Sequence, residues 1–114
     1  MSRISTHVLD TAKGKPASGV PVRLERQESS GKWTPVGSAQ TDQDGRCAQL
    51  LLDGVTVVEG VYRLTFDTAN YFAACGVEGL YPSVEISFRI KSGESHFHIP
   101  LLLSPHGYTT YRGS

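Results

Sequence analysis

The sequence has little cysteine, no excess charge of either sign and no long hydrophobic run. Its 114 residues include 2 cysteines, and 11 basic side chains balance 11 acidic ones. A neutral chain without a basic cluster has no electrostatic reason to bind nucleic acid or a membrane surface. No apolar run approaches the roughly 18 residues of a membrane-spanning helix, and the first residues lack the apolar core of a signal peptide. We therefore expect no nucleic-acid partner and no membrane partner.

The two cysteines, Cys47 and Cys75, stand in no metal-binding or redox spacing. The simplest interpretation is two reduced, partly buried thiols in a reducing compartment, although the sequence also permits a disulfide between them. A chain of this length buries roughly two-thirds of its extended surface, so it folds without disulfide or metal. We expect a single domain over residues 1–114.

Alternation of apolar and polar residues predicts strands at a spacing of about ten residues. The expected strands cover residues 4–9, 20–26, 33–41, 47–52, 55–66 and 84–90, and the tail after Glu94 reads as a strand, a Ser-Pro-x-Gly turn and a second strand to residue 114. Pro21 costs one ladder bond, so its strand lies at a sheet edge or begins there. One helix is expected over residues 67–76, with Asp67 as N-cap and Gly76 as its end. Seven or eight strands and one helix predict a mainly β fold, a two-sheet sandwich.

Histidine and arginine are the candidate chemical groups. Side chains alternate along a strand, so His7 faces away from Ile4 and Val8, and His96 and His98 share one face. Arg46 follows a tight turn in which Gly45 is expected at positive φ. Neutral imidazoles can take a proton from water, and arginine can stabilise developing negative charge, so these groups suit metal-free hydrolysis of an electron-poor ring amide.

Other interpretations of the same residues remain open at this point. Each could be an exposed surface residue, and His7, His96 and His98 could supply the three nitrogens of a zinc site. His106, in the turn of the tail, has no assigned role.

Several separated segments resemble the transthyretin-related family, whose members include 5-hydroxyisourate hydrolases. They are His-Val-Leu-Asp-Thr-Ala-x-Gly-x-Pro-Ala at 7–17, Thr-x-x-Asp-Gly-Arg at 41–46, Asp-Thr-x-x-Tyr-Phe at 67–72, His-x-His-Ile-Pro-Leu-Leu at 96–102, and the terminal Tyr-Arg-Gly-Ser at 111–114. The resemblance implies a transthyretin-like sandwich of two four-stranded sheets with one short helix. It also implies a homotetramer, a dimer of dimers, with active sites in the channel between dimers.

The activity implied by the resemblance is hydrolysis of 5-hydroxyisourate to 2-oxo-4-hydroxy-4-carboxy-5-ureidoimidazoline, with no cofactor and no metal. By the same resemblance, His7, Arg46, His98 and Ser114 are catalytic and bind the substrate, and Tyr111 lines the substrate-binding wall. His7 and His98 would activate and orient water, Arg46 would hold a substrate carbonyl, and Ser114 would position substrate or a histidine proton. His96 would support His98 or point into a subunit interface.

Three other functions compete with this one. A non-catalytic transthyretin-like carrier would need a channel lined by small and aliphatic residues. A structural adhesion module would need an extracellular signal or linker, and a metal-dependent hydrolase would be sensitive to chelators. The terminal Arg-Gly-Ser differs from a peroxisomal Ser-Lys-Leu signal, which favours a bacterial cytoplasmic protein.

Overall fold

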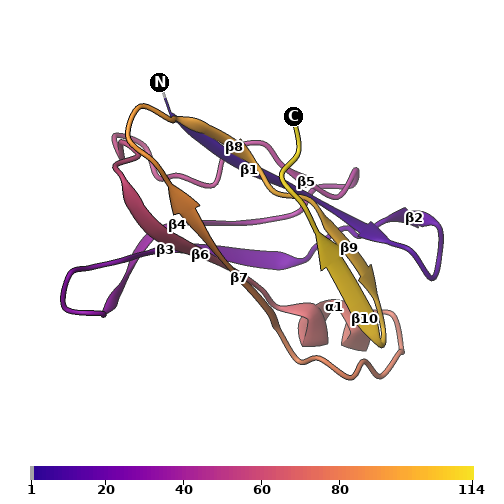
Figure 1. Cartoon of the computed structure of the whole chain (residues 1–114). Helices are drawn as coiled ribbons and strands as arrows, with labels where there is room; N and C mark the ends of the chain where they lie inside the picture. Colours follow the sequence, from indigo (N-terminus) through magenta and orange to yellow (C-terminus); the bar gives the residue numbers. More distant parts are fainter. Residues whose placement is uncertain (1) are drawn as a thin grey trace.

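The chain folds into two β-sheets packed face to face, with a short helix at one end (Figure 1). The computed structural model describes residues 2–114. The four-stranded antiparallel sheet has the order β4-β3-β6-β7, formed by β3 (Pro21–Gln27), β4 (Trp33–Gln40), β6 (Gly60–Phe66) and β7 (Val84–Ile90). The second sheet is built on β1 (Arg3–Asp10), with β2 (Lys15–Pro16), β5 (Arg46–Cys47), β8 (His96–His98), β9 (Leu101–Ser104) and β10 (Gly107–Thr110). The predicted β-sandwich with one short helix is confirmed.

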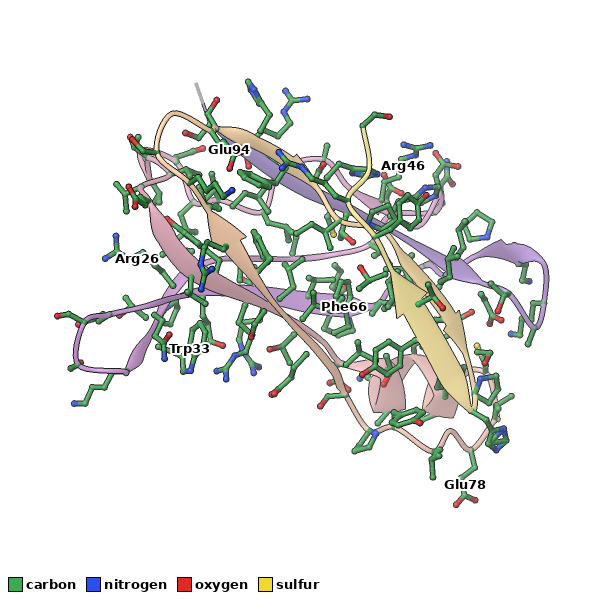
Figure 2. All side chains as sticks on the ribbon, in the orientation of Figure 1. Arg26, Trp33, Arg46, Phe66, Glu78 and Glu94 are labelled. Carbon is green, nitrogen blue, oxygen red and sulfur yellow. The ribbon has the colours of Figure 1, made fainter. Side chains whose placement is uncertain are left out.

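The core lies between the two sheets and follows from the alternation along each strand. In β1, Ile4 and Val8 are fully buried, and in β6 Leu64 and Phe66 are fully buried. Figure 2 shows Phe66 pointing into the space between the sheets. Burying one such side chain stabilises the fold by about 1.5–3 kcal/mol. The opposite faces of the strands are left for polar side chains.

Strand β1 is the centre of the second sheet. On one edge it pairs in parallel with β8 through Ser5 and His98, and then with β9. On its other edge it pairs antiparallel with β5, which sets His7 opposite Arg46, and with β2. The line of β8 and β9 is interrupted at Pro100, which has no N–H to donate to a ladder. The resemblance implied two four-stranded sheets, but the sheet built on β1 has six strands. Two of them, β8 and β9, lie in one line that is broken at Pro100, and two others, β2 and β5, have only two residues each.

Two expected strands are shorter in the structure than the alternation suggested. β5 ends at Cys47, although the pattern extended to residue 52, and β6 begins at Gly60 instead of residue 55. The Tyr62 hydroxyl accepts a hydrogen bond from the Val58 N–H (3.1 Å) and donates one to the Val58 carbonyl (2.8 Å). The Tyr62 side chain therefore satisfies the backbone of Val58 in place of a neighbouring strand.

The predicted helix and the start of the second strand agree with the structure. Helix α1 spans Thr68–Ala74, and the Asp67 carboxylate accepts a hydrogen bond from the Asn70 N–H (3.0 Å) as its N-cap. β3 begins at Pro21, as one of the two expectations had it, and it lies between β4 and β6 and not at an edge. Within residues 2–114, no helix is long and apolar enough to cross a membrane.

Both cysteine side chains are free thiols, Cys47 buried and Cys75 half-buried. The alternative of a disulfide between them is therefore absent from the described chain.

Candidate active site

A pocket of about 610 Å³ lies where β1, β5 and β8 meet the C-terminal residues. Figure 2 shows Arg46 on the outer side of this sheet, away from Phe66 and the core. The lining combines polar and cationic side chains with the chain terminus: Arg3, Ser5, Thr6, Arg46, Cys47, Ala48, His96, Phe97, His98, Arg112, Gly113 and Ser114. Three of the four residues expected to be catalytic, Arg46, His98 and Ser114, are therefore brought together.

Arg46 is presented by a turn that its own sequence specifies. The Asp42 carboxylate accepts hydrogen bonds from the N–H groups of Asp44 and Arg46, both at 2.9 Å. The bond from the Arg46 N–H, with the nearby charges of Arg46 and His7, lowers the pKa of Asp42. Gly45 has φ +77°, as expected, and a Cβ there would lie 2.4 Å from the Val8 carbonyl oxygen. Only glycine fits this close approach, which places Arg46 beside β1.

His7 lies next to Arg46 but beside the pocket, not in its lining. Its Nε2 is 2.9 Å from the Asp44 carbonyl oxygen. A carbonyl oxygen only accepts, so Nε2 carries a proton and donates it. The imidazole of His7 is thereby tied to the turn that carries Arg46.

His98 is half-buried in β8 and is held through both its backbone and its ring. Its carbonyl oxygen accepts a hydrogen bond from the Gly113 N–H at 2.7 Å, and its Nδ1 is 2.8 Å from the Ser5 hydroxyl oxygen. Burial lowers the pKa of His98, and the positive charges of His7 and Arg46 lower it further. His98 is therefore neutral near pH 7, the state in which an imidazole can accept a proton.

The C-terminal residues are attached to β8 without forming a strand. β10 ends at Thr110, so the expected strand to residue 114 is wrong beyond that point. Arg112 instead donates to the Glu94 carboxylate (3.3 Å) and stacks its guanidinium 4.5 Å from the centre of the Phe97 ring. These contacts, with the bridge from Gly113 to His98, bring Ser114 to the pocket.

Two other candidates of the sequence lie elsewhere. Tyr111 is 55% exposed and lines a second groove of about 240 Å³, which adjoins the pocket at Phe97 and Arg112. His106 is exposed in the turn between β9 and β10, outside the pocket lining.

Three arginines line the pocket, and one of them, Arg112, is paired with the Glu94 carboxylate just outside the lining. Arg3, Arg46 and Arg112 contribute guanidinium groups, and no Asp or Glu side chain is among the lining residues. The buried Cys47 thiol has its pKa raised to about 11, by burial first and then by the charge of Asp42, so it stays uncharged. Such a site suits a ligand rich in carbonyl oxygens or negative charge.

The residues of this pocket that the sequence did not single out include Arg3, Ser5 and Arg112. The alternation of β1 carried a signal for two of them, because Arg3 and Ser5 share the face of His7. Nothing local indicated that Arg112 would reach back to Glu94. In the described chain, no three His, Cys, Asp or Glu side chains lie close enough together to hold a metal ion.

The chain is similar in sequence and in fold to known proteins. The profile of the HIUase/Transthyretin family matches residues 4–113. A 5-hydroxyisourate hydrolase of Mus musculus is 47% identical over 114 residues, covering 99% of this chain and 96% of the relative. The solved structure of Klebsiella pneumoniae 5-hydroxyisourate hydrolase has a TM-score of 0.85 and 39% identity, with all of both chains covered.

A transthyretin is similar in fold as well. Sea bream transthyretin in complex with thyroxine has a TM-score of 0.89 and 31% identity, covering 97% of this chain and 94% of that one. Sequence and fold agree over nearly the whole chain, and the protein therefore belongs to the HIUase/Transthyretin family.

Proposed function

We propose that this protein is a 5-hydroxyisourate hydrolase that opens a ring amide of its substrate with water. The observation that carries the proposal is the register of β1, which sets Arg46 opposite His7 and His98 opposite Ser5, so that Arg46 and His98 line one polar pocket. The 47% identical relative from Mus musculus carries the same name. The substrate's carbonyl-rich ring matches the cationic lining.

His98 is the general base of this mechanism. It lines the pocket, and its lowered pKa keeps it neutral near pH 7. His7 donates from Nε2 to the Asp44 carbonyl, so it serves to hold the turn that carries Arg46. His98 removes a proton from water, the oxygen bonds to a ring carbonyl carbon, and the C–N bond of that amide breaks as its nitrogen takes this proton back from His98.

Arg46 and the C-terminus complete the site. The Arg46 guanidinium holds the attacked carbonyl edge and stabilises its negative charge as the water adds. Ser114 positions the substrate through its hydroxyl or its terminal carboxylate. Tyr111 lies outside this pocket in one chain, so its expected contact with substrate requires a neighbouring chain.

A transthyretin-like carrier is the second candidate, favoured by the TM-score of 0.89 to the thyroxine complex of sea bream transthyretin. The lining of the pocket separates the two functions. An apolar aromatic ligand needs small and aliphatic walls, whereas three arginines and two histidines surround this pocket. The hydrolase is therefore the function that the residues support.

The proposal includes a homotetramer in the bacterial cytoplasm. β7 and β10 are edge strands in the described chain, and each can pair with a second copy. The exposed Tyr111 and the apolar groove around it lie beside the same edges. Closed symmetric assembly would cover these apolar groups.

The test is the decay of freshly generated 5-hydroxyisourate, followed by ultraviolet absorbance after urate oxidation in the cuvette. Protein should accelerate the decay, and a chelator should leave the rate unchanged. Titration with thyroxine, monitored by calorimetry, provides the contrast with a carrier and should give no binding. Folded protein that binds thyroxine and leaves the decay rate unchanged would overturn the proposal.

A further inference from the structure

Ser5 contacts His98 at Nδ1, the ring nitrogen next to the carbon that joins the ring to the rest of the side chain. Its hydroxyl oxygen is 2.8 Å from His98 Nδ1 and 3.5 Å from the Phe97 carbonyl oxygen. Both contacts follow from the parallel register of β1 and β8, in which Ser5 is the partner of His98. Figure 1 shows these two strands lying side by side.

The Ser5 hydroxyl has one proton and two contacts, so it can donate to only one of them. The Phe97 carbonyl can only accept, so its 3.5 Å contact with the Ser5 hydroxyl is a hydrogen bond only when the hydroxyl donates to it. The hydroxyl oxygen then accepts from Nδ1, which must carry the imidazole proton. In the opposite arrangement, Ser5 would donate to Nδ1 and its contact with the Phe97 carbonyl would have no proton. Both contacts are hydrogen bonds only when His98 is protonated on Nδ1.

The opposite edge of the ring is closed by Gly113. A Cβ on Gly113 would lie 2.5 Å from His98 Cδ2 and 3.3 Å from Cγ, so the ring occupies the space of the missing side chain. With Ser5 on the Nδ1 edge and Gly113 on the Cδ2 edge, rotation of the ring is restricted. No hydrogen bond from the described residues engages Nε2. In the neutral Nδ1–H form, this nitrogen carries the lone pair.

We propose that Ser5 is a positioning residue that holds His98 in the tautomer protonated on Nδ1, so that Nε2 is the nitrogen that takes the proton from water. The inference rests on the proposed hydrolase function. It assigns no contact with substrate to Ser5, which acts through the ring of His98. Because a free neutral histidine favours the proton on Nε2, removal of the hydroxyl turns the reactive nitrogen from an acceptor into a donor.

The first measurement needs no substrate. Two-bond proton–nitrogen correlation spectra of ¹⁵N-labelled protein, recorded where His98 is neutral, report which ring nitrogen carries the proton. Wild-type protein should give the Nδ1–H pattern for His98, Ser5→Ala should move it toward Nε2–H, and Ser5→Thr should restore it. Ser95→Ala is the matched control, since the Ser95 hydroxyl is 3.5 Å from Nδ1 of the exposed His96. It should leave the His98 signals unchanged.

The second measurement is steady-state hydrolysis by the same variants. Ser5→Ala should lower kcat by roughly 10-fold to 100-fold, part of the 10²–10⁴ that a general base contributes, with KM little changed. Ser5→Thr should recover kcat to within a few-fold of wild type, and Ser95→Ala should match wild type. This pattern separates tautomer control from a structural effect, because the variants that keep a hydroxyl at position 5 are fast and the one that lacks it is slow.

Three outcomes would overturn the inference: an Nε2–H signal for His98 in wild-type protein, unchanged kcat in Ser5→Ala, or a Ser5→Thr variant as slow as Ser5→Ala despite a wild-type spectrum. Wild-type protein that leaves 5-hydroxyisourate unhydrolysed would instead remove the proposed function. The spectra would then still decide whether Ser5 sets the tautomer of His98.

Discussion

Replacing Gly45 with alanine tests how the turn before β5 presents Arg46. Gly45 has φ +77°, and a Cβ there would meet the Val8 carbonyl oxygen at 2.4 Å. Gly14 is a matched control, because it has φ +69° and nothing lies within 4 Å of a Cβ at that position. Both substitutions carry the backbone penalty of a left-handed alanine, but only Gly45→Ala also forces the turn away from β1.

The expected magnitudes follow from these two terms. The left-handed conformation costs a non-glycine residue about 1–2 kcal/mol, and this should be the whole loss of unfolding free energy in Gly14→Ala. At Gly45 the clash also breaks the hydrogen bond from the Val8 N–H to the Gly45 carbonyl, 2.7 Å long. Loss of that bond adds about 0.5–1.5 kcal/mol, for a total of about 1.5–3.5 kcal/mol.

Activity should separate the two variants more clearly than stability. A displacement near 1 Å of a catalytic group can cost about 100-fold in rate, so Gly45→Ala should lose activity by a factor of about that size through Arg46. Gly14→Ala should keep wild-type activity. The assays are denaturant unfolding at one fixed protein concentration, since assembly would link stability to concentration, and hydrolysis of 5-hydroxyisourate. Equal stability losses with wild-type activity in both variants would refute the role given to the turn.

Four further changes have defined outcomes. Arg46→Ala should lower kcat/KM by roughly 10²–10³, the usual effect of removing one charge-stabilising donor, and activity within a few-fold of wild type in the hydrolysis assay would exclude this role. Tyr71→Phe removes the hydroxyl that donates to the buried Asp10 carboxylate at 2.7 Å, so the free energy of unfolding in a urea titration should fall by about 1–3 kcal/mol. Burial and the charges of His7 and Arg46 lower the pKa of His98, so protonation and loss of kcat/KM should set in below the ordinary histidine value of about 6.5; a pH–rate profile with its acidic midpoint above that value would contradict His98 as the base. Deleting Ser114 should reduce kcat roughly tenfold, or about 1.4 kcal/mol of transition-state stabilisation, without lowering the unfolding midpoint; unchanged turnover would make the terminus structural only.

The sequence was sufficient to predict the fold where local patterns decide it. Strict alternation located the strands around Ile4 and Leu64, and Asp67 marked the start of the helix. The prediction from alternation was wrong between residues 48 and 59, where three valines suggested a strand. There the Tyr62 hydroxyl and the Ser2 side chain bond the backbone instead, through contacts that depend on tertiary structure. The order of strands in each sheet was also not predictable, since alternation indicates which face of a strand is buried and not which strand it pairs with.

The candidate site was predictable in composition and only partly in arrangement. The alternation on β1 and β8 gave the faces of His7 and His98, and the Asp-Gly turn gave the position of Arg46. The partnership of Ser5 with His98 required the register between strands that are far apart in the chain. The prediction that Tyr111 contacts substrate came from the family resemblance alone. Its position in the second groove depends on where β10 ends, and no local sequence pattern marks that end.

The parallel pairing of β1 with β8 and β9 has a consequence for the order of folding. In the four-stranded sheet, β3 with β4 and β6 with β7 are antiparallel neighbours that follow one another in the chain, so these two pairs can form from sequential contacts. β1 can pair with β2 early, but its partners β8 and β9 come much later in the chain, since Ser5 and His98 are 93 residues apart. Such distant pairings close slowly. During synthesis on the ribosome, the first strand therefore emerges long before the strands that complete its sheet, and the pocket is assembled last.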